Sequence, residues 1–186
     1  RQVRQIANGT TTNYFHDKYN PLAEYDSATQ RVVRYTHNLI IDDIVSATRG
    51  DSVDWYHKDA LGSVMMLTDA NETITLEYSY APFGTIMLYS DLTNPNTLTY
   101  TGRRFDAGME LYNVRSRYYN AVTGRFIRKD DYLGDIFNPN SVHRYSYVNS
   151  NPLNFVDPLG DRAVQINVLM YLTNGFAMTT AILDEV

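Results

Sequence analysis

Short segments in which apolar and polar residues alternate, each followed by a polar turn, recur along the first half of the chain. The clearest example covers residues 74–80, where isoleucine, leucine and tyrosine alternate with threonine, glutamate and serine. A period of two is typical of a β-strand that buries one face. Pro82-Phe83-Gly84 follows directly and ends that strand. The pattern therefore predicts an all-β fold built from antiparallel hairpins.

The remaining strands and turns of this half follow the same rule, at a spacing of roughly twenty residues. They are a hairpin over 14–25 with its turn at Asn20-Pro21, a turn over 26–30, a strand over 31–35, a strand over 63–68 and a turn over 69–72. Asn20 and Asn71 stand where glycine is common, and asparagine tolerates a left-handed backbone. An irregular repeat of this length favours a stacked array, in which each hairpin pairs with the next. We expect a free edge near Tyr14 that makes the isolated chain associate.

Length and composition restrict the classes of protein. At 186 residues, with 44% hydrophobic and 20% charged content, the chain suits one globular domain. The formal net charge of −5 argues against a protein that mainly coats nucleic acid. The sequence holds no cysteine, and its four histidines lack metal-ligand spacing, so we predict no disulfide, no metal and no cofactor. Sixteen tyrosines against one tryptophan favour a half-covered β surface whose hydroxyl groups meet water.

The second half is richer in arginine. Residues 111–119 have the sequence Leu-Tyr-Asn-Val-Arg-Ser-Arg-Tyr-Tyr, which predicts a strand with Arg115 and Arg117 two residues apart. Because guanidinium groups stack on aromatic rings, an inward network of arginine and tyrosine is the favoured interpretation. A nucleic-acid surface over residues 103–128 is the weaker alternative, given the acidic total.

Three aspartates follow this segment: Asp130, Asp131 and Asp157. Two carboxyl groups held close share a proton, so that one can activate water while the other donates to a scissile carbonyl. A nearby arginine can hold one carboxylate ionised and orient it through two parallel hydrogen bonds. Structural explanations stay open as well. Asp157-Pro158 makes a good turn without catalysis, and Asp130-Asp131 suits a solvated loop.

Four motifs, in this order along the chain, resemble those of the RHS (YD-repeat) family. They are YHKDALGSV at 56–64, YSYAPFG at 78–84, YTGRRFD at 100–106 and PLNFVDPLG at 152–160. The resemblance implies a spiralling antiparallel hairpin sheet that forms part of a hollow shell. It also implies a division into terminal YD-type repeats (1–99), an RHS repeat-associated core (100–160) and a short C-terminal extension (161–186).

The core domain of this family is associated with self-cleavage just after its closing motif, which releases the C-terminal extension inside the shell. By position, the resemblance implies that Arg117, Asp130 and Asp157 are catalytic residues of an aspartyl autoprotease. It places the cleavage region at Gly160 and Asp161.

This chain departs from the family pattern at three positions. Asn120 and Asp131 stand where the family usually has aspartate and proline, and Asp161 stands where it favours leucine or an aromatic residue. A charge in place of a side chain that should fill an apolar pocket is expected to weaken the positioning of the scissile peptide.

Two functions are consistent with these residues. The resemblance implies a shell segment of a secreted or cell-surface bacterial toxin that encapsulates a C-terminal cargo; no signal peptide is visible in these residues. Its partners would be the upstream YD repeats of the same protein and a cargo or immunity protein, with no nucleic acid. The alternative is a cell-surface β scaffold that binds carbohydrate or protein through its tyrosines in adhesion.

The tail changes character. Residues 163–183 contain no charge over a length that would span a bilayer, but glutamine, asparagine and threonine dilute them. We therefore expect a half-buried helix or strand packed against the shell, and no membrane partner.

Overall fold

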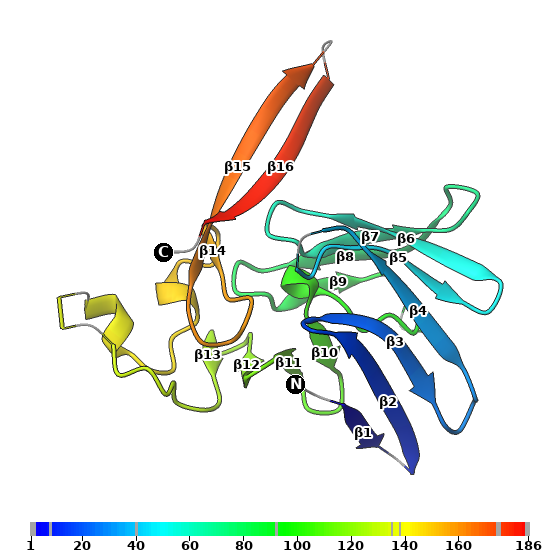
Figure 1. Cartoon of the computed structure of the whole chain (residues 1–186), viewed down its shortest axis with the longest axis horizontal. Coiled ribbons are helices and arrows are strands. Elements are labelled where there is room, and N and C mark those ends of the chain that lie inside the picture. The colour runs from blue at the N-terminus through cyan, green and yellow to red at the C-terminus, as the bar shows by residue number, and fades with distance from the viewer. Residues whose placement is uncertain are drawn as a thin grey trace.

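The computed structural model describes residues 3–7, 9–39, 41–91, 93–134, 136–137, 139–173 and 176–184. Strands dominate these residues, and every strand pairing among them is antiparallel (Figure 1). The all-β prediction is confirmed.

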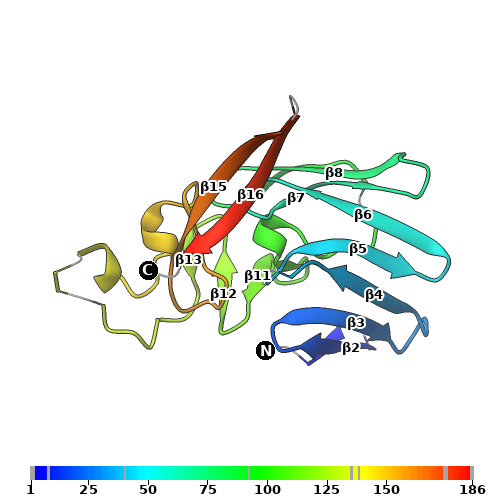
Figure 2. The same cartoon turned by 45° about the horizontal axis from the view of Figure 1, so that its top comes forward.

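Nine strands form the largest sheet, in the order in which they occur along the chain. They are β1 (Arg4–Ala7), β2 (Thr10–Asp17), β3 (Asn20–Asp26), β4 (Val32–His37), β5 (Ile44–Arg49), β6 (Ser52–Lys58), β7 (Val64–Thr68), β8 (Ile74–Tyr80) and β9 (Ile86–Tyr89). Each strand hydrogen-bonds to the next through a hairpin, and the sheet twists strongly from β1 to β9 (Figures 1 and 2). This sheet is the hairpin array that the repeats predict.

Aspartate side chains fix two of the predicted turns. In the turn over 26–30, the Asp26 carboxylate accepts the backbone N–H groups of Ala28 and Thr29. In the turn over 69–72, Asp69 accepts those of Asn71 and Thr73 at 2.8 and 2.9 Å. These bonds lower the pKa of both aspartates, and they are the local interactions that make aspartate a turn residue. Both predicted turns and the strand over 74–80 are confirmed.

The first hairpin turn, however, lies two residues before the predicted one. Lys18 and Tyr19 make the turn, with Lys18 in the left-handed region at φ 48°, and Asn20 already pairs with Asp17 at the start of β3. The Asn20 side chain is used elsewhere, because its carbonyl oxygen accepts the backbone N–H of Asp42 at 2.9 Å. The prediction of a turn at Asn20-Pro21 was wrong.

The exposed edge of the sheet also differs from the expectation. Tyr14 lies in β2, which pairs with β1 along its outer edge, and its buried ring is covered by Arg104. The edge of the sheet is therefore β1, within the part of the chain that the structure describes.

A second sheet of four strands follows in chain order: β10 (Arg104–Asp106), β11 (Leu111–Val114), β12 (Arg117–Asn120) and β13 (Arg125–Phe126). Short 3-10 helices flank it: η1 (Tyr100–Gly102), η2 (Pro139–Val142) and η3 (Val148–Ser150). Residues 111–119 are not the single strand that their sequence predicts. Arg115 has φ 53° and, with Ser116, forms a tight turn that folds β12 back on β11.

Tyrosine hydroxyl groups fasten the four-stranded sheet to the nine-stranded one. The hydroxyls of Tyr100, Tyr119 and Tyr112 donate to three successive backbone carbonyls at 2.9, 2.7 and 2.7 Å. Those carbonyls belong to Pro82, Phe83 and Gly84, respectively, the turn after β8. Buried hydroxyls need such partners, and burial raises the pKa of all three tyrosines. The expectation that tyrosine hydroxyls meet water was therefore wrong at these positions.

A third sheet contains β14 (Phe155–Val156), β15 (Val164–Thr173) and β16 (Phe176–Asp184). The tail is thus a strand hairpin, one of the two forms expected. It pairs with β14 at its base and extends away from the other sheets instead of packing along them (Figures 1 and 2). Among the described residues there is no helix with the length and apolar character that a membrane span requires.

Candidate functional site

Arg117 is the centre of the candidate site. It is the first residue of β12, directly after the Arg115-Ser116 turn, and its side chain is buried. The guanidinium carbon lies 3.7 Å from the centroid of the Phe126 ring, on the neighbouring strand β13. The aromatic face fixes the side chain and leaves the guanidinium N–H groups free to point at polar partners.

One guanidinium nitrogen faces both predicted carboxylates. Arg117 Nη2 lies 2.7 Å from Asp130 Oδ2 and 3.6 Å from Asp157 Oδ2. The structure therefore brings together the three residues that the family resemblance singles out. Asp131, the alternative partner in sequence, is exposed. The two carboxylates that share an environment are Asp130 and Asp157, which are 27 residues apart, and not the adjacent pair.

Arg144 holds the backbone around Asp130. The Arg144 guanidinium donates to the carbonyl oxygen of Asp130 through Nε at 2.8 Å and also through Nη2. In return, the Asp130 N–H donates to the Arg144 carbonyl at 2.8 Å. Asp130 also accepts the N–H of Tyr132 through Oδ1, so Oδ2 is the oxygen that faces Arg117. These contacts orient one carboxylate oxygen toward the centre.

Asp157 is almost fully buried, with 3% of its surface exposed. Its Oδ1 accepts the backbone N–H groups of Gly160, Asp161 and Arg162 at 2.6, 3.1 and 3.4 Å. Burial raises the pKa of Asp157 to about 6, although these hydrogen bonds and the two nearby arginines, Arg103 and Arg117, act in the opposite direction. A carboxyl group with this pKa can donate a proton near neutral pH.

The carbonyl group of Gly160 receives two strong donors. Ser116 Oγ donates to it at 2.6 Å and Arg117 Nε at 2.5 Å. Gly160 has φ 81°, and a Cβ added there would lie 2.1 Å from the Val114 carbonyl oxygen. Glycine is thus required for this close approach. Two donors on one carbonyl oxygen resemble an oxyanion hole, because they stabilise the negative charge that develops when water attacks the carbonyl.

The same pattern extends over the whole closing segment, residues 157–160. Each of its four successive carbonyl groups accepts a hydrogen bond, and the donors all belong to residue 103 or residues 115–117. Arg103 Nη2 donates to Asp157, Arg115 Nη1 to Pro158, the Ser116 N–H to Leu159, and Ser116 Oγ and Arg117 Nε to Gly160. The closing segment therefore lies in a cradle whose shape the β11–β12 turn sets.

An open cleft of about 910 Å³ lies beside this segment. Charged side chains make up much of its lining: Arg117, Arg128, Lys129, Asp130, Asp131, Arg144, Asp157, Asp161 and Arg162. Asp161 is exposed on this cleft. The apolar pocket expected for the residue after Gly160 is therefore not what surrounds Asp161, and an acidic residue suits the basic side chains nearby.

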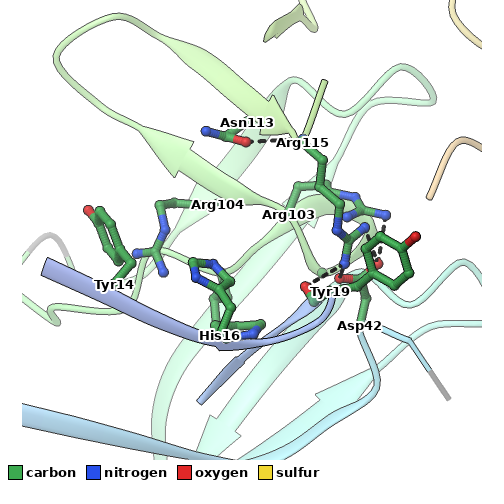
Figure 3. A pocket seen from close by; sticks show the side chains of 11 residues that line it. Tyr14, His16, Tyr19, Asp42, Arg103, Arg104, Asn113 and Arg115 are labelled. Carbon is green, nitrogen blue, oxygen red and sulfur yellow. Dashed lines mark hydrogen bonds and ion pairs between the residues drawn. The ribbon is translucent and has the colours of Figure 1, made fainter. Parts of the chain in front are cut away.

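Several residues of the site were missed from the sequence. Ser116, Arg103 and Arg115 contact the closing segment, and the Asp42 carboxylate lies between the two arginines (Figure 3). From the sequence, these arginines were predicted only to belong to an inward network of arginine and tyrosine. The turn that brings Arg115 and Ser116 to the segment has no glycine or proline, so the pattern did not reveal it.

Arg103, Arg104, Arg115 and Arg117 face inward, as predicted. Arg104 lies 4.3 Å from the Tyr14 ring centroid and pairs with Glu24, and Arg115 lies 5.5 Å from that of Tyr19. The charges of these four arginines are paired with carboxylates or lie against aromatic rings, whereas Arg125 and Arg128 are exposed. His57 accepts or donates a hydrogen bond with Thr68 at 3.0 Å, a structural contact. Within the described residues, no cluster of three or more His, Cys, Asp or Glu side chains could hold a metal ion.

Known proteins resemble this chain in sequence and in fold, although no protein-family model matches it. It is 30% identical over 163 residues to the tRNA3(Ser)-specific nuclease WapA of Bacillus spizizenii, covering 86% of this chain and 7% of WapA. It is 26% identical over 167 residues to double-stranded DNA deaminase toxin A of Burkholderia cenocepacia, covering 86% of this chain and 11% of that protein. The crystal structure of TcdB2-TccC3-Cdc42 matches 85% of the chain with a TM-score of 0.65 at 21% identity, over 8% of its own length. The chain therefore corresponds to a small part of much longer proteins.

Proposed function

We propose that this chain, which these similarities relate to RHS-type toxin proteins, is a segment of a toxin-associated β-shell that cleaves its own backbone after Gly160. One observation carries the proposal. The carbonyl group of Gly160 accepts hydrogen bonds from Ser116 and Arg117, and the same guanidinium of Arg117 faces two carboxylates, Asp130 and Asp157. A polarised carbonyl beside a base and a buried acid is what peptide hydrolysis requires.

Each residue has a defined role in the reaction. Asp130, which lines the cleft, takes a proton from a water molecule, whose oxygen attacks the Gly160 carbonyl carbon. Ser116 and Arg117 stabilise the negative oxygen that forms. The C–N bond then breaks as the nitrogen of Asp161 takes up the proton that Asp157 supplies; before the reaction, Asp157 Oδ1 accepts the N–H of Asp161 at 3.1 Å. Water is consumed, and the products are a carboxyl group on Gly160 and an amine on Asp161.

The shell role rests on the sheet. The nine hairpin-linked strands form a sheet whose edge strands are β1 and β9, and further strands can pair with these edges to extend it. The relatives contain many times more chain than this segment. We propose that the upstream repeats of the same protein pair with β1 and that residues after Gly160 begin the cargo. An immunity protein against that cargo and a secreted or cell-surface location follow from the same proposal.

The alternative role as an adhesion scaffold has less support. It depends on tyrosines that face outward, and eight of the fifteen tyrosines whose side chains the structure describes are buried. Three of these buried tyrosines, Tyr100, Tyr112 and Tyr119, join the two larger sheets, and none of the eight is available for carbohydrate or protein contact.

The experiment is the intact mass of the purified chain after incubation between pH 5 and pH 8. We expect a fragment of residues 1–160 that accumulates faster near pH 5 than near pH 8, because Asp157 must be protonated. Asp130→Asn should abolish it. Asp131→Asn is the matched control, since it removes the neighbouring exposed carboxylate, and it should cleave as the wild type does.

Two results would contradict the proposal. An intact wild-type chain at every pH would show that the site is structural. A fragment that also appears in Asp130→Asn would assign the cleavage to other chemistry.

A further inference from the structure

Asp42 links the hairpin array to the candidate cleavage centre, although the closing segment of that centre lies more than a hundred residues further along the sequence. It lies in the loop between β4 and β5, and its carboxylate is inserted between two guanidinium groups (Figure 3). Asp42 Oδ2 lies 2.7 Å from Arg103 Nη2, and Asp42 Oδ1 lies 2.5 Å from Arg115 Nη2. The three side chains are 7–13% exposed, so water screens these interactions weakly.

Both arginines continue from Asp42 to the closing segment. Arg103 Nη2, the atom that binds Asp42, also lies 3.5 Å from the carbonyl oxygen of Asp157. Arg115 Nη1 contacts Asp42 Oδ2 at 3.0 Å and donates to the carbonyl of Pro158. Asp42 is therefore linked to the carbonyl group of Asp157 through Arg103, and to the carbonyl group of Pro158 through Arg115.

Charge explains why Asp42 is needed at this place. Arg103 and Arg115 are two like charges in a buried space. Burial, and then the charge of Arg103, lowers the pKa of Arg115, while Asp42 acts in the opposite direction. Without the carboxylate the two guanidinium groups repel each other, and they can separate only by leaving the carbonyls of Asp157 and Pro158.

The backbone confirms a tight junction at this loop. Gly102, next to Arg103, has φ 69°, and a Cβ there would lie 3.1 Å from the Asp42 carbonyl oxygen. The N–H of Thr101 also donates to Ser63 Oγ, in the loop before β7, at 3.2 Å. Residues 101–103 therefore pack directly on the array, so that a displacement of the Asp42 loop is transmitted to Arg103.

We infer that Asp42 is a positioning residue of the cleavage centre: through Arg103 and Arg115 it holds the closing segment in its cradle, so that Gly160 is presented to Arg117 only when the hairpin array is packed on the core. The inference rests on the proposed self-cleavage. It makes an array residue a condition for the reaction, because a carbonyl displaced by about 1 Å loses the proximity advantage, roughly a hundredfold in rate.

The chain offers a matched control. Glu24, in β3, forms a second partly buried ion pair between the array and the core, with Arg104 at 2.5 Å. Arg104 bonds to Thr97 and does not contact the closing segment through any hydrogen bond recorded among the described residues. Glu24→Gln therefore removes a similar charge without touching the cradle. Asp42→Asn is the test variant, because asparagine tolerates the left-handed backbone of Asp42 at φ 63°.

Two measurements are made on each variant. The first is the rate of cleavage by intact mass, for which we expect at least a tenfold loss in Asp42→Asn and no change in Glu24→Gln. The second is backbone hydrogen exchange at residues 160–162, whose N–H groups bind Asp157, recorded with Asp130→Asn to keep the chain intact. We expect about tenfold faster exchange there with Asp42→Asn and no change with Glu24→Gln. Asp42→Glu, which keeps the charge, should recover part of both effects; Glu72 and Glu110 already adopt left-handed conformations in this chain.

The outcomes separate the inference from the function on which it rests. A wild-type chain that stays intact refutes the cleavage, while the exchange experiment still decides whether Asp42 positions the segment. Equal effects of Asp42→Asn and Glu24→Gln on exchange at 160–162 would overturn the inference. So would an unchanged cleavage rate in a folded Asp42→Asn chain.

Discussion

Replacing Gly160 with alanine tests the cradle directly. Gly160 has φ 81°, and an added Cβ would lie 2.1 Å from the Val114 carbonyl oxygen and 2.6 Å from Ser116 Oγ. The first of these atoms belongs to the backbone and cannot move without disturbing the β11–β12 turn. Gly50→Ala is the control, because Gly50 also has a positive φ, 61°, but has no neighbouring atom within 4 Å of the added Cβ.

The two variants share one energetic term and differ in another. In both variants the left-handed conformation of alanine costs about 1–2 kcal/mol. Gly160→Ala also overpacks the cradle, which adds about 1–3 kcal/mol. In a chain of this length 1 kcal/mol corresponds to about 2–4 °C in Tm, so Gly160→Ala should melt roughly 2–12 °C below Gly50→Ala.

Thermal unfolding followed by circular dichroism measures this difference, and intact mass measures cleavage of the same samples. We expect no cleavage in Gly160→Ala, since its carbonyl leaves Ser116 and Arg117, and normal cleavage in Gly50→Ala. Equal melting temperatures for the two variants would refute the reasoning, because they would mean that residue 160 does not approach the β11–β12 turn closely.

Ser116→Ala removes one of two donors to the Gly160 carbonyl and should slow cleavage about a hundredfold with the chain still folded; an unchanged rate by intact mass would exclude Ser116 from the site. Because burial raises the pKa of Asp157 from its ordinary 3.8 to about 6, the folded chain binds this proton more tightly than the unfolded chain does. The resulting stability is complete below about pH 4 and is lost, by roughly 3 kcal/mol, as the pH rises through 6; urea unfolding should show this loss in the wild type and not in Asp157→Asn. Tyr119→Phe removes the hydroxyl that donates to Phe83 and leaves that carbonyl without this donor, so it should lower the free energy of unfolding by about 1–3 kcal/mol; a loss well below this range would mean that the contact does not fasten the sheets. The free edge of β1 should make the isolated chain associate in analytical ultracentrifugation at micromolar concentration, and a monodisperse monomer would count against an open edge.

Part of the site was accessible from the sequence. The family resemblance singled out Arg117, Asp130 and Asp157, and these side chains lie together. Which two aspartates lie together could not be predicted from the sequence. Asp130 and Asp131 are neighbours in sequence, but Asp131 is exposed while Asp157 is buried beside Arg117, and burial is a property of the packed chain.

The sequence by itself determined the β class and most of the hairpins, because strand alternation and aspartate turns depend on residues a few positions apart. Asp26 and Asp69 fix their turns through their own neighbours, so reading them needed no knowledge of the fold. Only the tertiary structure decided that residues 115 and 116 form a turn, and that Asp42 reaches the closing segment through arginines more than sixty residues away. Those contacts exist because the two sheets pack on each other, and no local pattern encodes which buried charges then meet.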